Sequence, residues 1–332
     1  MRRLFKGILI VLVVLGGLAA GFFFGFAPFR AERSAAANAQ FRVDHQAAHD
    51  AVDAKFNQQD KLVNGISWHY VDEGSPNGKV ILFLHGLPEG WYSWSKVLPL
   101  VDHSYRLIAI DMKGYGRSTA ADDDYNWHTV AAQTLDLMTS LGINQFYLVS
   151  HDWGTIIGSV MAVDHPERIL GYVRMEADLI QRKSSMLEMY AKKPQWLLFQ
   201  SYFIGKYMME DGAWFIDFVY SQRMATPFQA ADRDYLVYEF SRPDAALTLP
   251  KYFLQKNWDL DAAIGKICQT RLPFKVLQLQ ADGDPSQPPS IFAEVPVECP
   301  SVQLEWVKNA NHFDNFDQPE QVAQAINRFI KP

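Results

Sequence analysis

The residues best suited to do chemistry are Ser150 to Gly154, which read S-H-D-W-G. They follow the apolar run 146–149 and precede a helix-like stretch at 155–162. A strand, a sharp turn and a helix in this order, with small residues two positions before and after the tip, are typical of a strained turn that exposes a nucleophile. The tip residue is Asp152, so the expected nucleophile is a carboxylate.

A carboxylate nucleophile restricts the reaction class. Its attack on an sp³ carbon gives an alkyl-enzyme ester, which water can later cleave at the carbonyl carbon of Asp152. A serine attacking the same carbon would form an unreactive ether. The substrate should therefore carry an electrophilic alkyl carbon with a leaving oxygen or halide. The alternative is that Asp152 is only a helix N-cap, a role that explains neither the small flanking residues nor the motifs below.

Composition limits the function classes. The chain has 332 residues, of which 48% are hydrophobic and 14% aromatic, enough for a large core in one domain with an insertion. The net charge of −6 provides no basic patch for nucleic acid, so we expect no nucleic-acid partner.

The N-terminal segment predicts a membrane anchor or signal segment in residues 1–30. Residues 7–27 are uncharged and apolar, long enough to cross a lipid bilayer as a transmembrane helix. Three basic residues precede them, Arg2, Arg3 and Lys6. This charge pattern favours a body exported to a periplasmic or other extracytoplasmic space. Signal cleavage after Ala37-Asn38-Ala39 is the alternative and would give a secreted protein. We expect residues 31–60 to form a polar, Ala-rich linker, with a short helix as the alternative over about residues 30–56.

The elements that must position Asp152 follow from the rest of the pattern. From about Gly65, short apolar runs alternate with helical segments, which predicts an α/β fold with a mainly parallel sheet and helices on both faces. A long aromatic interval with helical spacing, 178–263, predicts a helical cap inserted between core segments 61–177 and 264–332. We expect strands at Ile66–Asp72, Val80–His85, Arg106–Asp111, Phe146–Ser150, Gly171–Met175, Phe274–Gln280 and Val302–Val307.

Two more motifs follow consecutive strands. His85-Gly86-Leu87-Pro88 reads H-G-x-P, and 111–118 reads D-x-x-G-x-G-x-S. With the D-W turn, their order resembles the α/β-hydrolase superfamily, and specifically its epoxide hydrolase and haloalkane dehalogenase branch, over about residues 62–331. The resemblance implies an enzyme, an epoxide hydrolase, that opens epoxides to diols without a cofactor or metal.

The resemblance also implies an oxyanion hole. It assigns this role to the backbone N–H groups of Leu87 and Trp153, which would stabilise charge on Asp152 during ester hydrolysis. Pro88 resembles a family proline that is often cis. Dehalogenases commonly carry Asn or Glu at the Leu87 position, so Leu87 favours epoxides.

The base should be a histidine near the chain end, and His312 in N-A-N-H-F fits. Two acids are candidates for orienting it. Asp284 lies 28 residues before His312, as in many epoxide hydrolases, and Glu176 lies 24 residues after Asp152, as in some dehalogenases and secreted epoxide hydrolases. We favour Asp284. If both acids line one pocket, one of them could be protonated.

In the family, two cap tyrosines donate hydrogen bonds to the epoxide oxygen. Tyr252 matches the second, while the first aligns near Phe199-Gln200, with Tyr202 slightly further on. Packing within the cap is the alternative role for both tyrosines. We expect Trp153, Phe199, Gln200 and Tyr252 to contact a small apolar epoxide-type substrate.

Two other functions are compatible with the sequence. A haloalkane dehalogenase would use the same Asp152, and a non-catalytic anchored binding or sensor protein could use the same scaffold. The combination of Asp152, His312 and an acid argues against the binding protein. In an exported body, Cys268 and Cys299 are candidates for a disulfide, and two separate buried thiols are equally compatible with the sequence.

Overall fold

The computed structural model describes residues 27–120, 122–179, 199, 204–243, 245–253 and 266–331. In this part of the chain, eight strands form one sheet in the order β1-β2-β4-β3-β5-β6-β7-β8. The strands are β1 (Gln58–Val63), β2 (Ile66–Gly74), β3 (Val80–Leu84), β4 (Arg106–Ile110), β5 (Phe146–His151), β6 (Ile169–Met175), β7 (Val276–Ala281) and β8 (Val302–Val307).

The sheet is mainly parallel, as the sequence predicts. β1 and β2 pair antiparallel, as do β2 and β4, and every pairing from β4 across to β8 is parallel. The five residues of β3, VILFL, are all buried, which suits a strand covered on both faces. The seven expected strands are present. β1 was not expected, because its polar sequence QQDKLV forms an edge that pairs on one side only.

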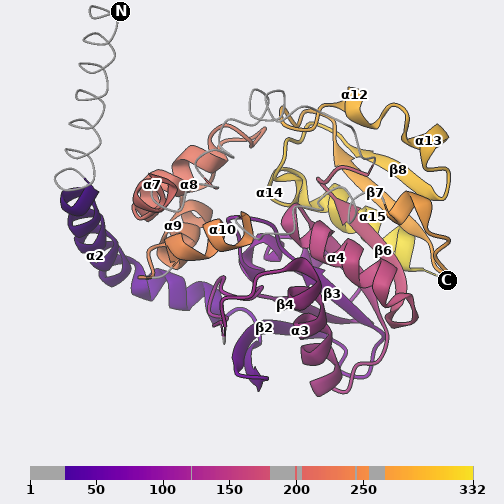
Figure 1. Cartoon of the computed structure of the whole chain (residues 1–332), viewed down its shortest axis with the longest axis horizontal. Coiled ribbons are helices and arrows are strands. Elements are labelled where there is room, and N and C mark those ends of the chain that lie inside the picture. Colours follow the sequence, from indigo (N-terminus) through magenta and orange to yellow (C-terminus); the bar gives the residue numbers. More distant parts are fainter. Residues whose placement is uncertain are drawn as a thin grey trace, which may run out of the picture.

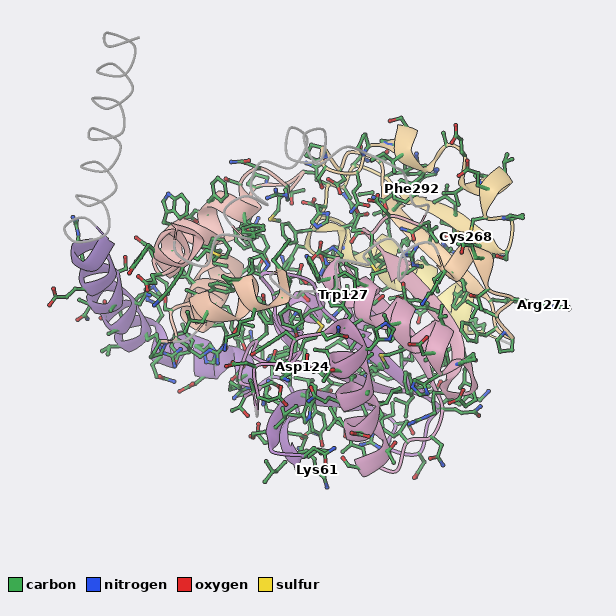
Figure 2. All side chains as sticks on the ribbon, viewed as in Figure 1. Lys61, Asp124, Trp127, Cys268, Arg271 and Phe292 are labelled. Atoms are coloured by element: carbon green, nitrogen blue, oxygen red, sulfur yellow. A yellow bond between two sulfur atoms is a disulfide. The ribbon has the colours of Figure 1, made fainter. Side chains whose placement is uncertain are left out.

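Helices and turns complete the core. α3 packs against α4, and α15 packs against β6, β7 and η3. Figure 2 shows Trp127, the first residue of α3, in the middle of the molecule and Lys61 of β1 at its periphery. The core helices are α3 (Trp127–Ser140), α4 (Trp153–Asp164), α12 (Pro289–Phe292), α13 (Val295–Glu298), α14 (Asp314–Asp317) and α15 (Pro319–Ile330), with 3-10 turns η2 (Trp91–Trp94), η3 (Leu98–Leu100) and η4 (Pro166–Arg168).

Helices lie between β6 and β7 in the chain, in the interval for which the sequence predicts a cap (Figure 1). Its described helices are α7 (Ile204–Met209), α8 (Gly212–Tyr220), α9 (Ala230–Phe240) and α10 (Ala245–Phe253). Hydrogen bonds join it to the core: Tyr92 donates to Asp232 over 2.8 Å, and Thr248 donates to the Gly114 carbonyl over 2.9 Å. These contacts fix α9 and α10 above the loops that follow the strands.

The segment expected to be a linker or a short helix is mostly helix, and the helix is long. α2 (Ala27–Asp53) spans 27 residues and contacts α7, α8 and α9 of the cap (Figure 1). His49 bonds Glu239 over 2.8 Å, and Asp53 accepts from Tyr235 over 2.7 Å. α2 docks largely through hydrogen bonds rather than an apolar stripe, so its hydrophobic pattern gave no sign of this packing.

The expected membrane anchor, residues 7–27, lies outside the described residues apart from Ala27 at the start of α2. None of the helices in the described ranges combines the length and the apolar character needed to span a bilayer.

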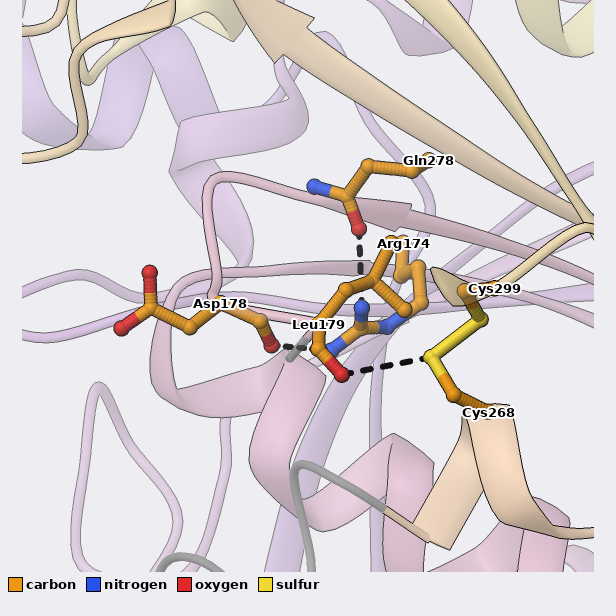
Figure 3. Close-up of a disulfide and its surroundings, with 6 residues drawn as sticks. All are labelled: Arg174, Asp178, Leu179, Cys268, Gln278 and Cys299. Atoms are coloured by element: carbon orange, nitrogen blue, oxygen red, sulfur yellow. Dashed lines mark hydrogen bonds between the residues drawn. A yellow bond between two sulfur atoms is a disulfide. The ribbon is translucent and has the colours of Figure 1, made fainter. Parts of the chain in front are cut away.

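Cys268 and Cys299 form a disulfide with a Cα–Cα distance of 4.9 Å. Cys268 follows the cap in sequence, and Cys299 ends α13 just before β8. The Cys268 sulfur lies 3.3 Å from the carbonyl oxygen of Leu179, at the start of the cap insertion (Figure 3). The disulfide therefore sits where the cap leaves and rejoins the core. Beside it, the buried Arg174 donates to Gln278 over 2.9 Å.

Candidate active site

Asp152 occupies a strained turn between β5 and α4. Its φ is +47° and its ψ is −117°, a conformation that residues other than glycine rarely adopt. Two glycines make room for it. A Cβ on Gly154 would lie 2.5 Å from the His85 carbonyl oxygen, and a Cβ on Gly86 would lie 2.5 Å from the Cβ of Asp152. The small residues therefore allow the backbone to pass close to the nucleophile candidate.

Four neighbouring strands deliver the reactive side chains to one edge of the sheet. Asp152 follows β5, Glu176 follows β6, Asp284 follows β7 and His312 follows β8. Because these strands are adjacent and parallel, the loops after their carboxyl ends meet at the same edge. Residues far apart in sequence are thereby brought together.

His312 connects two of these carboxylates. Its Nε2 lies 3.3 Å from Asp152 Oδ2, and its Nδ1 lies 2.9 Å from Asp284 Oδ2. Glu176 Oε2 is further away, 3.8 Å from the same Nδ1. With Nδ1–H donating to Asp284, Nε2 faces Asp152. Of the two candidate acids, Asp284 is the one that holds His312 in orientation.

The two acids differ in protonation. Burial alone would raise the pKa of Asp284, but His312 and the Ser286 hydroxyl outweigh burial and hold the pKa well below its usual range. Asp284 Oδ1 also accepts from the Ser286 N–H and hydroxyl, each over 2.7 Å. Burial, with repulsion from Asp314 and Asp284, raises the pKa of Glu176 well above its usual range. Burial and the neighbouring carboxylates therefore favour the protonated form of Glu176 beside an ionised Asp284.

Asp152 is held in its ionised form. Burial alone would raise its pKa, but the hydrogen bond and charge of His312, the charge of His151 and the Leu87 amide together lower it. The Leu87 N–H donates to Asp152 Oδ1 over 2.9 Å, and the Leu87–Pro88 peptide is cis. Trp153 contributes its ring nearby, while its amide is not among the donors to Asp152 in the described part of the chain. Oδ1 of Asp152 thus accepts the Leu87 N–H, and Oδ2 of Asp152 faces His312.

A pocket opens onto Asp152 and His312. Its apolar walls are formed by Leu87, Trp153, Phe199, Val219, Phe253 and Phe313. Ser286, Gln287 and Arg223 supply the other polar groups in the described lining. Leu87, Trp153 and Phe199 were expected here from the sequence. Arg223 was not, because no motif marks it within the helical insertion.

The comparisons with known proteins agree with this architecture. The model of a family described as alpha/beta hydrolase fold matches residues 79–319. The chain belongs to the alpha/beta hydrolase fold family. Curated relatives of this alpha/beta hydrolase include proteins named epoxide hydrolases.

Particular relatives show the extent of this similarity. The mouse protein named epoxide hydrolase 4 is 38% identical over 109 residues, 32% of this chain and 30% of that protein. The matches with the highest identity thus span about a third of those relatives. Epoxide hydrolase 2 of Caenorhabditis elegans is 28% identical across 88% of this chain and 84% of its own. Cfl2 from Burkholderia cenocepacia shares the fold, with a TM-score of 0.74 at 23% identity, covering 82% of this chain and 95% of its own.

In this alpha/beta hydrolase, Tyr252 lies outside the pocket lining. Its hydroxyl donates to the Lys113 carbonyl over 3.0 Å, and its buried ring packs against those of Tyr115 and Tyr125. Its neighbour Phe253 lines the pocket instead. The structure therefore gives Tyr252 the packing role that was the alternative. Gln200 and Tyr202, also expected near the substrate, lie outside the described residues.

A buried ion pair lies behind the nucleophile candidate. His151 Nε2 donates to the His312 carbonyl over 2.7 Å, and its Nδ1 lies 3.1 Å from Glu89 Oε1. Burial alone would lower the pKa of His151, but the charge and hydrogen bond of Glu89 raise it to about 10. His151 is thus a cation next to Asp152. In the sequence, the one sign of this ion pair was Glu89, the residue directly after the H-G-x-P motif.

Glu176, Asp284 and His312 could place three ligand atoms within 4.8 Å of one another. Hydrogen bonds already occupy these atoms, however. Asp284 bonds His312, and the Glu176 oxygens accept from the Ala281 N–H over 2.5 Å and the Gln280 side chain over 2.6 Å. Hydrogen bonds within the protein thus account for the polar atoms of this cluster.

Proposed function

We propose that this alpha/beta hydrolase opens epoxides to diols through a covalent ester on Asp152. The observation that carries the proposal is the position of His312, bonded to Asp284 through Nδ1 and facing Asp152 through Nε2. An ionised carboxylate beside a base suits attack on an alkyl carbon followed by hydrolysis. The names of the curated relatives support epoxides as the substrate class.

In the first step, Asp152 Oδ2 attacks the less hindered epoxide carbon. The ring C–O bond breaks, its electron pair moves to the oxygen, and the resulting alkoxide takes up a proton. Oδ1, which accepts from the Leu87 N–H, becomes the ester carbonyl oxygen. In this proposal Tyr202 keeps its expected role as donor to the epoxide oxygen, and Tyr252 does not take it.

The second step depends on the loss of charge at Asp152. Burial alone would lower the pKa of His312, but the charges and hydrogen bonds of Asp284 and Asp152 outweigh burial and raise it. Esterification removes the Asp152 charge, so the pKa of His312 falls and Nε2 can accept a proton. The water that gives up this proton attacks the ester carbonyl carbon, and the Leu87 amide stabilises the oxyanion. Collapse releases the diol as His312 returns its proton to the departing oxygen. Asp152 is then a carboxylic acid, and its ionisation gives back the proton that the alkoxide took up in the first step.

Trapping the ester tests the proposal. The full chain carrying His312→Gln is incubated with terminal epoxides and with bromoalkanes, and its intact mass is measured. We expect an adduct equal to one whole epoxide, absent from an Asp152→Asn control. An alkyl adduct with bromide release, and none from epoxides, would assign a haloalkane dehalogenase. No adduct from either set would favour the non-catalytic binding protein.

We also propose that the body is exported and anchored through residues 7–27. The apolar N-terminal sequence and the Cys268–Cys299 disulfide support this location, because disulfides persist in oxidising compartments. Protease added to intact spheroplasts should digest the body while a cytoplasmic marker survives. Membrane fractions should hold it at full mass, whereas a shortened soluble product would indicate a cleaved signal.

A further inference from the structure

Arg223 places a permanent positive charge in the wall of the pocket. It lies on the turn after α8 and lines the pocket with Asp152 and His312. Its Nη1 donates to the Val219 carbonyl over 3.2 Å, and within the described ranges the guanidinium has no other hydrogen bond. An arginine carries five N–H donors in a planar fork. Among the described residues, most of these donors therefore have no acceptor and can serve a ligand.

The turn that carries Arg223 is fixed to the core by Asp317. This carboxylate accepts from the N–H of Ala225 over 2.8 Å, and from the N–H and hydroxyl of Thr226 over 2.9 and 2.6 Å. It also accepts from the N–H of Asn311, next to His312, over 3.0 Å. One buried carboxylate thus holds the Arg223 turn against the loop of the base. Arg223 has a defined position relative to the reacting groups.

The charge balance of the pocket changes during the proposed reaction. Burial lowers the pKa of Arg223 and the charges of Asp284 and Asp152 raise it, but an arginine stays protonated in proteins. In the resting enzyme Asp152 helps to balance this cation. Once Asp152 becomes a neutral ester, Arg223 faces mainly apolar walls with less compensation. A negative group on the substrate would restore the balance at that stage.

We propose that Arg223 binds a carboxylate of the substrate, so that the enzyme acts on epoxides carrying a carboxylic acid near the ring. The inference rests on the proposed epoxide opening. A carboxylate matches the planar guanidinium in a two-point hydrogen bond. A phosphate dianion would call for further cations, and Arg223 is the one Lys or Arg in the described pocket lining. The apolar walls then accommodate the rest of the substrate.

Matched substrates test the role of Arg223. An epoxy acid and its neutral primary amide are compared by kcat/KM in the full chain, in Arg223→Gln and in Arg223→Lys. Arg233→Gln is the control, because Arg233 is a cation of α9 that pairs with Asp217 at the surface and does not line the pocket. We expect the acid to be preferred by wild type. Arg223→Gln should lose about 10- to 100-fold on the acid and little on the amide.

Arg223→Lys should fall between wild type and Arg223→Gln on the acid, since it keeps the charge but not the fork. Arg233→Gln should match wild type on both substrates. Equal losses on acid and amide in Arg223→Gln would overturn the proposal, because they would indicate a role in the chemistry or in folding. A wild type that does not distinguish acid from amide would overturn it as well.

Binding of an unreactive acid separates this inference from the epoxide activity. Butanoate is titrated calorimetrically into wild type, Asp152→Asn, Arg223→Gln and Arg233→Gln. We expect binding in wild type and Arg233→Gln, tighter binding in Asp152→Asn because a repelling charge is gone, and none in Arg223→Gln. If butanoate binds through Arg223 but no epoxide is turned over, the anion site stands and the proposed function is refuted. If epoxides are turned over but no binding depends on Arg223, the proposed function stands and the anion site is refuted.

Discussion

Nδ1 of His312 lies 2.9 Å from Oδ2 of Asp284, within hydrogen-bonding distance. The competing acid, Glu176, is 3.8 Å from the same nitrogen, and its surroundings favour its protonated form. An ionised acid stabilises an imidazolium, whereas a protonated one does not. The two carboxyl groups therefore have separate roles: Asp284 is the partner of the base, and a hydrogen bond with Glu176 helps to lower the pKa of Asp284.

Asp284→Asn should slow hydrolysis of the Asp152 ester by about 10²- to 10⁴-fold, because His312 loses the acid that sets its tautomer. Glu176→Gln should cost less than about 10-fold, since the amide still offers a donor toward Asp284. Decay of the ester, followed by intact mass in single turnovers, measures both. The reverse ranking would make Glu176 the catalytic acid.

The two steps should respond differently to pH. Attack needs ionised Asp152, whose pKa is lowered, so alkylation should persist below the usual carboxylate range. Hydrolysis needs neutral His312, whose pKa is raised in the resting enzyme and falls on esterification. Its rate should rise with pH and level off once His312 has lost its proton. Rapid-quench measurements of ester formation and decay from pH 4 to 9 check this; two profiles with the same pH dependence would contradict it.

Tyr252→Phe should leave ester formation within about threefold of wild type, because the hydroxyl is bonded to the Lys113 carbonyl and lies outside the pocket lining. The protein should instead lose about 1–3 kcal/mol of unfolding free energy, since a buried acceptor loses its donor. Urea unfolding and alkylation rates test the two parts. A large loss of alkylation at unchanged stability would show that Tyr252 reaches the substrate.

Much of the site could be predicted because each reactive residue follows an apolar strand, and adjacent parallel strands bring their ends together. Counting residues favoured Asp284 over Glu176 but left both acids open. Both lie at that edge, and only their distances from His312 separate them.

The cap was harder to predict. Successive residues on a helix point about 100° apart, so aligning α10 to within one residue does not tell whether Tyr252 or Phe253 faces the substrate. The packing of α2 against the cap was not predicted for another reason. It meets the cap through polar partners such as Glu239, and hydrophobic periodicity does not detect such contacts.

Glu89→Gln should destabilise the fold by about 3–5 kcal/mol near pH 6.5, because it leaves His151 buried without its counter-ion. The folded pKa of His151 is about 10, above the value near 6.5 of an unfolded histidine. Its stabilising contribution is therefore complete below about pH 6.5 and is lost as pH rises to about 10. Urea midpoints of both proteins should converge over this window; a constant difference would argue against the ion pair.

Removing the disulfide should lower the free energy of unfolding by about 3–4 kcal/mol, from the chain entropy of a 31-residue separation. The variant Cys268→Ser with Cys299→Ser is compared with wild type in guanidinium, with and without reductant. Reductant should lower the midpoint of wild type and leave that of the variant unchanged. If wild type is insensitive, the bond contributes nothing to equilibrium stability.

Asp317 gives the cap a dependence that its helices alone do not reveal. Its carboxylate takes donors from Ala225 and Thr226 on one side and from Asn311 on the other. A cap transplanted from a homologue without matching donors would leave this buried carboxylate with the Asn311 N–H as its one remaining donor among those described, next to His312. Exchange of caps to alter specificity will therefore succeed only when the new cap keeps the donors to Asp317 that Ala225 and Thr226 supply here.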